Sequence, residues 1–163
     1  ADSVLWAVKN KVTSGISTTT FAPNASCTRA QAVTFLWRAM GSPEPTNTKN
    51  PFTDVKSDAY YYQAVLWAVE KGITGGTTAT TFSPDATVTR AQTVTFLYRG
   101  AGSPAATASK TFTDVPSVAY YADAVSWATG KGVKAGVSTT MFAPNASCTR
   151  GQIVTFLFRD LNK

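Results

Sequence analysis

The sequence contains no histidine and only two cysteines among its 163 residues. Without histidine, catalytic triads with an imidazole base and metal sites with imidazole ligands are excluded, and two cysteines cannot build a four-cysteine metal site. Charged residues make up 15% of the chain, against ~25% in a typical globular domain. No apolar run approaches the ~18 residues of a membrane-spanning helix. We therefore expect no enzymatic activity, no metal or other cofactor and no membrane span.

The charge that is present is unbalanced, with 15 basic and 9 acidic residues, a formal net charge of +6 and a pI near 9.5. Such a balance favours an anionic partner: nucleic acid, an acidic membrane surface or an acidic polysaccharide. The basic residues are spread along the chain and not clustered, which counts against nucleic acid. Hydrophobic residues account for 44% of the sequence, enough for a packed core.

Three copies of one unit make up the chain. The strings T-R-A-Q, T-R-A-Q and T-R-G-Q begin at Thr28, Thr89 and Thr149, and F-x-P begins at Phe21, Phe82 and Phe142. Markers that recur in a fixed order after about 60 residues indicate tandem structural repeats. We expect repeat 1 over 1–43, repeat 2 over 52–104 and repeat 3 over 112–163, within one integrated domain. The string F-T-D-V begins repeats 2 and 3 but has no counterpart in repeat 1.

Each unit is predicted to be a helix, a loop and a second helix. The first helix is amphipathic and is expected to end at Gly72 or Gly132 in a left-handed cap. Repeat 1 has Lys11 at that place, so Asn10 is expected to cap instead. The second helix begins with a capping box, Thr28 with Gln31 in repeat 1. Its broad apolar surface predicts a mainly all-α fold, with the three second helices at the centre and the first helices outside.

All six arginines fall at two repeat positions. Arg38, Arg99 and Arg159 lie near the C-terminus of the second helix, where a cation is stabilising. Arg29, Arg90 and Arg150 follow the capping threonine, where a cation opposes the helix dipole. A guanidinium beside helix N-terminal amides would make an anion site. The alternative for this first set is a structural salt bridge, for example to Asp54 or Asp114.

The repeated tryptophans have two alternative roles, and the two cysteines have two alternative states. Tryptophans repeat at Trp6, Trp67 and Trp127, either as core anchors or as stacking platforms for a sugar. Tyrosine clusters at 60–62 and 120–121 are expected mostly to pack, with some lining the same groove. Cys27 and Cys148 precede two capping boxes where repeat 2 has Val88, which favours small buried side chains. A disulfide is the alternative if the helix starts meet at an axis.

The strings F-T-D-V, A-x-x-W-A-x-x-x-G, the turn glycine, F-x-P and T-R-A-Q, in this order, resemble the S-layer homology domain over nearly the whole chain. The resemblance implies a pseudo-threefold trimer of helix-loop-helix repeats around a central three-helix bundle. It also implies grooves between repeats that bind secondary cell-wall polysaccharide, often at a pyruvylated N-acetylmannosamine. The expected function is non-covalent anchoring at the bacterial cell wall, outside the cell.

The resemblance also implies which residues contact the glycan. The arginine that holds the acidic sugar corresponds to Arg29, Arg90 and Arg150. Further family motif positions carry the tryptophans Trp6, Trp67 and Trp127, the turn glycines Gly15, Gly76 and Gly136, and the aspartates Asp54 and Asp114. The chain departs from the family in having glutamine where T-R-A-E ends in glutamate. Because repeat 1 lacks F-T-D-V, a groove that uses this segment is expected to be open or filled by another part of the chain, at the Arg29 site or its neighbour.

A second hypothesis is an adhesin or interaction module that binds a host or partner protein through its loops and exposed aromatic residues. Either function is compatible with a monomer, which we expect here.

Overall fold

The computed structural model describes residues 1–106, 111–133 and 136–162. This part of the chain forms helices and no strand: α1 (Asp2–Lys9), α2 (Arg29–Ala39), α3 (Tyr62–Glu70), α4 (Arg90–Gly100), α5 (Ala122–Gly130) and α6 (Arg150–Leu161). The predicted all-α class is confirmed. None of these helices combines the length and the apolar character that crossing a membrane requires.

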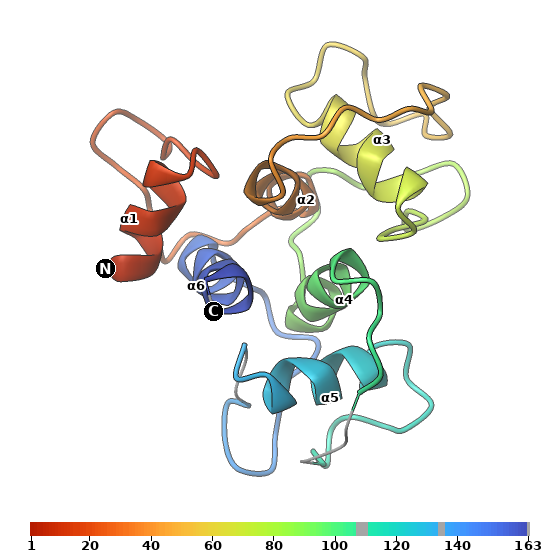
Figure 1. Ribbon diagram of the computed structural model, residues 1–163. Helices are drawn as coiled ribbons and strands as arrows, with labels where there is room; N and C mark the ends of the chain where they lie inside the picture. The colour runs from red at the N-terminus through yellow and green to blue at the C-terminus, as the bar shows by residue number, and fades with distance from the viewer. Residues whose placement is uncertain (107–110, 134–135, 163) are drawn as a thin grey trace.

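The second helices of the repeats, α2, α4 and α6, lie together at the centre, and α1, α3 and α5 surround them (Figure 1). Each outer helix packs on the inner helix of the preceding repeat: α3 on α2, α5 on α4, and α1 on α6. The packed pairs therefore cross the sequence repeats. The contact of α1 with α6 closes the ring, so the first and third repeats are neighbours. The segment 41–51, between repeats 1 and 2, joins the packed helices α2 and α3. The segment 102–110, between repeats 2 and 3, lies partly outside the described residues.

The inner helices all begin as the sequence predicts. Thr28, Thr89 and Thr149 accept a hydrogen bond from the backbone N–H of the glutamine three residues later, and that glutamine side chain accepts from the threonine N–H. The reciprocal pair satisfies two backbone donors at each helix start.

A closed ring of backbone hydrogen bonds joins the residues that precede the three capping threonines. The Cys27 N–H donates to the carbonyl oxygen of Cys148, the Cys148 N–H to Val88, and the Val88 N–H to Cys27, each at 2.9 Å. Both cysteines are fully buried thiols, as the equivalence with Val88 predicts, and the alternative disulfide is not formed. Burial, with a smaller effect from Cys148, raises the pKa of the Cys27 thiol to about 12, so the sulfur behaves as an apolar group.

The outer helices end in the left-handed conformation. Gly72 and Gly132 have φ of 69° and 68°, as predicted. In repeat 1 the Asn10 side chain donates to the carbonyl oxygen of Trp6 at 2.9 Å, in the capping role expected for it. Lys11 nevertheless adopts a φ of 58°, a conformation that its side chain disfavours.

Replacing Lys11 by glycine should therefore stabilise the protein. Relief of left-handed strain at a non-glycine residue is worth about 1 kcal/mol, partly offset by the greater chain entropy of glycine when unfolded. We expect a small increase in the midpoint of urea unfolding. The matched change Gly72→Ala introduces the same strain in repeat 2 and should lower the midpoint. Midpoints that move in the same direction would contradict this account.

Candidate functional site

The arginines that follow the capping threonines are buried, each with at most 4% of its surface exposed. Their Nε atoms donate to phenylalanine carbonyl oxygens of the next repeat: Arg29 to Phe82 and Arg90 to Phe142 at 2.9 Å, and Arg150 to Phe21 at 3.0 Å. The guanidinium carbon lies 4.8–4.9 Å from the centre of the same phenylalanine ring. Each arginine thus ties its helix to the neighbouring F-x-P loop by a hydrogen bond and a cation–π contact.

The first amides of the inner helices are used in the same way. In α2, the Arg29 N–H donates to the Ala86 carbonyl and the Ala30 N–H to the Pro84 carbonyl, and the equivalent bonds join α4 to repeat 3 and α6 to repeat 1. The anion site of helix amides expected from the sequence therefore does not form, because the neighbouring loop occupies these donors. The guanidinium groups, and not the helix amides, therefore provide the positive charge at these positions.

The aspartates of F-T-D-V hold the same loop from its other side. The Asp54 carboxylate accepts from the N–H groups of Phe82 and Ser83 at 2.8 Å. Asp114 accepts from Phe142 and Ala143 at 2.8 and 2.7 Å. Asp54 and Arg29 therefore bind the two polar backbone groups of one residue, Phe82, and are linked through this loop.

One groove of about 350 Å³ combines side chains of three repeats. Repeat 1 contributes Arg29, repeat 2 contributes Gly76, Phe96 and Arg99, and repeat 3 contributes Tyr120. Tyr120 is 62% exposed and packs edge to face against Tyr121. The groove therefore has two cations from separate helices and an aromatic ring at its mouth.

A second groove of about 260 Å³ repeats this arrangement one step around the ring. Arg150 corresponds to Arg29, and Gly15, Phe35 and Arg38 correspond to the loop and helix residues of the first groove. Tyr60 corresponds to Tyr120 and is also exposed. Two equivalent sites are thus built from different combinations of the same repeat positions.

The second arginine of each groove was explained from the sequence by the helix dipole alone. Arg99 Nη1 donates to the Ile73 carbonyl oxygen at 3.0 Å, and Arg38 Nη1 to that of Val12 at 3.5 Å. These bonds hold both side chains along the groove wall. The signal that could have identified them was the restriction of all six arginines to two repeat positions.

Both grooves offer positive charge that the protein does not fully compensate. Burial lowers the pKa of Arg29, although Tyr120 and Asp54 act in the opposite direction. In the part of the chain that the structure describes, the buried Nη2 of Arg150 has no hydrogen-bond acceptor. Burial also raises the pKa of Tyr60 and Tyr120, so both remain neutral phenols. An anion in either groove would therefore meet donors without competition from a nearby tyrosinate.

The turn glycines form the backbone wall of the grooves. Gly15 and Gly76 have φ of 86° and 88°. A Cβ atom at Gly76 would lie 2.5 Å from the Thr81 carbonyl oxygen, and one at Gly136 would lie 2.5 Å from that of Met141. Glycine is therefore needed here to close the loop. Gly15 and Gly76 line the two grooves.

Comparison with known proteins gives the same family as the motifs. The model of the S-layer homology domain matches residues 1–33, 51–94 and 111–154, which is most of the chain. The chain belongs to the S-layer homology domain family.

Three relatives show where such chains occur. This S-layer homology chain is 36% identical to an endoglucanase of a Bacillus species over 109 residues, 67% of the chain and 11% of that protein. It is 35% identical to a cell surface protein of Thermoanaerobacter kivui over 116 residues, 68% of the chain and 15% of that protein. It is 27% identical to a cellulosome-anchoring protein of Acetivibrio thermocellus over 154 residues, 88% of the chain and 34% of that protein. The chain thus spans about a third or less of the length of these relatives.

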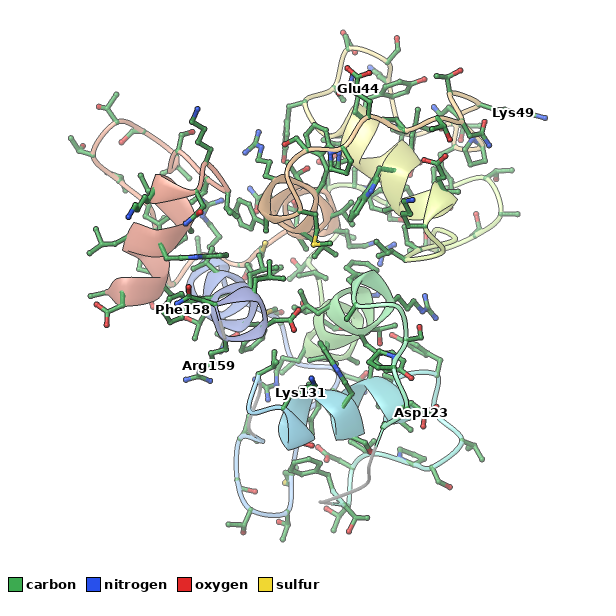
Figure 2. The ribbon with its side chains drawn as sticks, in the orientation of Figure 1. Glu44, Lys49, Asp123, Lys131, Phe158 and Arg159 are labelled. Carbon is green, nitrogen blue, oxygen red and sulfur yellow. The ribbon has the colours of Figure 1, made fainter. Side chains whose placement is uncertain are left out.

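The third equivalent position of this S-layer homology chain differs from the two grooves. Arg159 on α6 corresponds to Arg38 and Arg99, but it lines a wider hollow of about 520 Å³ beside Ser3 and Val4 of repeat 1. The described residues that line this hollow include no tyrosine. Arg159 is exposed and extends outward from α6 (Figure 2). Arg29 lines a groove that includes a tyrosine, so the position that differs is at Arg159.

The repeated tryptophans lie outside both grooves. Trp67 and Trp127 are almost fully buried, and Trp127 packs against Tyr98 with ring centres 5.7 Å apart. Trp6 is half-buried and packs against Phe158 with ring centres 5.8 Å apart. Phe158 lies where α1 meets α6 (Figure 2). These side chains pack between outer and inner helices. Of the two roles considered from the sequence, they therefore have that of core anchors.

We expect the Asp114 carboxylate to stabilise the fold in a pH-dependent way. Burial alone would raise the pKa of Asp114. The hydrogen bonds from the amides of Phe142 and Ala143 outweigh burial, so the pKa lies below its ordinary value of 3.8. A lowered folded-state pKa adds stability above the unfolded-state pKa, and this stability is lost as the pH falls through the folded value. Asp114→Asn should therefore destabilise the protein at pH 7 by about 1–3 kcal/mol.

Urea unfolding from pH 7 to pH 3 measures this effect, and the difference between wild type and Asp114→Asn should shrink as the carboxylate protonates. Asp123→Asn is the matched control, since Asp123 is exposed on α5 (Figure 2). A difference for Asp114→Asn that stays constant with pH would argue against the charged carboxylate as its source.

Proposed function

We propose that this chain anchors proteins non-covalently to the bacterial cell wall. In this proposal, the two grooves lined by Tyr60 and Tyr120 bind an acidic secondary cell-wall polysaccharide at a pyruvylated amino sugar. The main support for this proposal is the arrangement of side chains in the two grooves. In each groove, two arginines from different repeats converge beside an exposed tyrosine. The absence of catalytic chemistry is part of the proposal, since the groove side chains bind and position but include no pair of carboxylates.

The groove chemistry suits an acidic sugar. A guanidinium binds a carboxylate through two parallel hydrogen bonds, and these are stronger than bonds between neutral groups. The ring of Tyr60 or Tyr120 at the groove mouth can stack on the apolar face of a sugar while its hydroxyl stays in water. Arg150 offers the buried Nη2 noted above. Charge and stacking together would favour an acidic glycan over a neutral one.

The relatives support a location at the cell surface. They include a cell surface protein, a surface-layer protein and a cellulosome-anchoring protein. The endoglucanase shares only 11% of its length with this chain, so its activity is not carried over. An anchoring module that is attached to different proteins accounts for this variety of names.

Arg99 and Arg38 give the sharpest test of the grooves, because they are less buried than Arg29 and Arg150 and do not hold an F-x-P loop. The double variant Arg38→Gln, Arg99→Gln should bind purified cell-wall sacculi at least about tenfold more weakly. One charge-assisted hydrogen bond contributes about 1.5–3 kcal/mol, and about 1.4 kcal/mol is a factor of ten in affinity. Co-sedimentation at fixed salt measures the loss.

Arg159→Gln is the matched control, because Arg159 occupies the same repeat position in the open hollow. It should retain wild-type binding. Sacculi stripped of their secondary polymer should bind none of the three proteins, and a pyruvylated sugar should compete with intact sacculi. Binding that survives stripping would favour a protein target, and equal losses for Arg159→Gln and the double variant would contradict the assignment to these grooves.

A further inference from the structure

A hollow of about 470 Å³ lies beside the groove that contains Arg150 and Arg38. It is bounded by the start of α3 and by the segment between α2 and α3, with Glu44 beside α3 (Figure 2). Its lining includes Glu44, Thr48, Tyr60, Tyr62, Gln63 and Leu66, and we call it the Tyr62 hollow. Tyr60 also lines the groove, which we call the Tyr60 groove. The hollow and the groove are therefore neighbours that share one side chain.

Hydrogen bonds fix the wall that the segment between α2 and α3 gives to the hollow. Trp37 Nε1 donates to the Pro43 carbonyl oxygen at 2.8 Å, just before Glu44. The Thr46 N–H donates to the Glu70 carboxylate of α3 at 3.1 Å, just after Glu44 in the sequence. Glu44 thus lies between two fixed points of the backbone. A ligand would meet a wall that is already in place, which lowers the entropy cost of binding.

The side chains of the Tyr62 hollow suit a neutral sugar. Tyr62 is half-buried and Leu66 is 3% exposed, so both give the hollow apolar surface. An aromatic ring of this kind packs on the apolar face of a sugar. Gln63 and Glu44 are exposed and offer an amide and a carboxylate to hydroxyl groups. Among the described residues, no lysine or arginine lines the hollow, and the Glu44 carboxylate would repel a second acidic sugar.

The hollow lies where a polysaccharide bound in the Tyr60 groove would continue. A polymer held in the groove by one acidic sugar extends beyond that sugar, and the groove itself has a volume of about 260 Å³. Tyr60 is 58% exposed and lines both spaces. A chain bound in the groove would therefore pass over this ring into the larger hollow. This continuity favours the next sugar of the same polymer as the occupant.

Repeat 3 does not repeat this arrangement. The sequence has Ala122 where repeat 2 has Tyr62, and Asp123 where repeat 2 has Gln63. Both residues of repeat 3 line a smaller hollow of about 250 Å³, and Tyr120 is not among its described lining residues. The second aromatic ring and the side chain shared with a groove are thus both absent from the described part of this hollow.

We propose that the Tyr62 hollow is a second sugar subsite, which binds the neutral sugar next to the acidic sugar held beside Arg150. Tyr62 packs on the face of the neutral sugar, and Gln63 and Glu44 bind its hydroxyl groups. The inference rests on the proposed function and adds to it a requirement on the polymer, an acidic sugar followed by a neutral one. The Tyr60 groove then recognises two sugars, whereas the Tyr120 groove recognises the acidic sugar alone.

Titration with one and with two sugars tests the subsite in the protein that carries Arg99→Gln. This change weakens the Tyr120 groove, so that binding reports on the Tyr60 groove. Isothermal titration compares pyruvylated N-acetylmannosamine with a disaccharide, released from the purified wall polymer, that contains this sugar and its neighbour. Two further hydrogen bonds should make the disaccharide bind about tenfold more tightly. In amide NMR spectra, the disaccharide alone should shift the Thr48 and Gln63 resonances.

Protein variants locate the gain in affinity. The double variant Glu44→Ala, Gln63→Ala, made in the same background, should keep the affinity for the monosaccharide and lose the tighter binding of the disaccharide. Asp123→Ala is the matched control, since Asp123 is the counterpart of Gln63 in repeat 3. It should change neither affinity.

Two results would overturn the subsite while the groove stands. One is equal affinity for the monosaccharide and the disaccharide. The other is a gain in affinity that the double variant keeps, since the polymer would then leave the groove on another side. Binding of neither sugar would overturn the proposed function, and the subsite with it.

Discussion

The exchange of hydrogen bonds between each inner helix start and the next repeat is the constraint on which the fold depends. A helix leaves its first amides without partners inside the helix. Here the first two donate to carbonyls of the neighbouring loop, and the capping threonine accepts from the third. Since each repeat satisfies the helix start of another, the ring closes only when all three are present. The backbone ring of Cys27, Val88 and Cys148 is its centre.

This exchange explains why an arginine stands at a position that the helix dipole disfavours. The positive end of the dipole faces carbonyl oxygens of the next repeat, and the same loop offers one more carbonyl and a phenyl ring to the guanidinium. Arg29 is thus compensated enough to be buried. Its remaining donors lie along the groove between repeats. The structural contacts of Arg29 and its place in the groove wall therefore do not exclude each other.

The sequence predicted what depends on local patterns. Helix types, capping boxes, the central position of the second helices and the left-handed glycines all follow from residues a few positions apart. Which residues line a groove depends on contacts between repeats, and a chain of similar repeats does not indicate which copy contacts which. Arg38 and Arg99 were therefore explained within their own helices, where the dipole alone was sufficient. The tryptophans were assigned to the site because both a core and a groove role fit the same spacing.

The repeats also act as internal references, and differences between them carry physical information. Leu5 and Leu66 occupy one repeat position, yet their exposure differs because Leu66 has a covering segment. The same segment carries Tyr60 and Tyr120, which stand at the mouths of the two closed grooves. In repeat 2, one segment therefore both covers the outer helix α3 and completes a groove with its tyrosine.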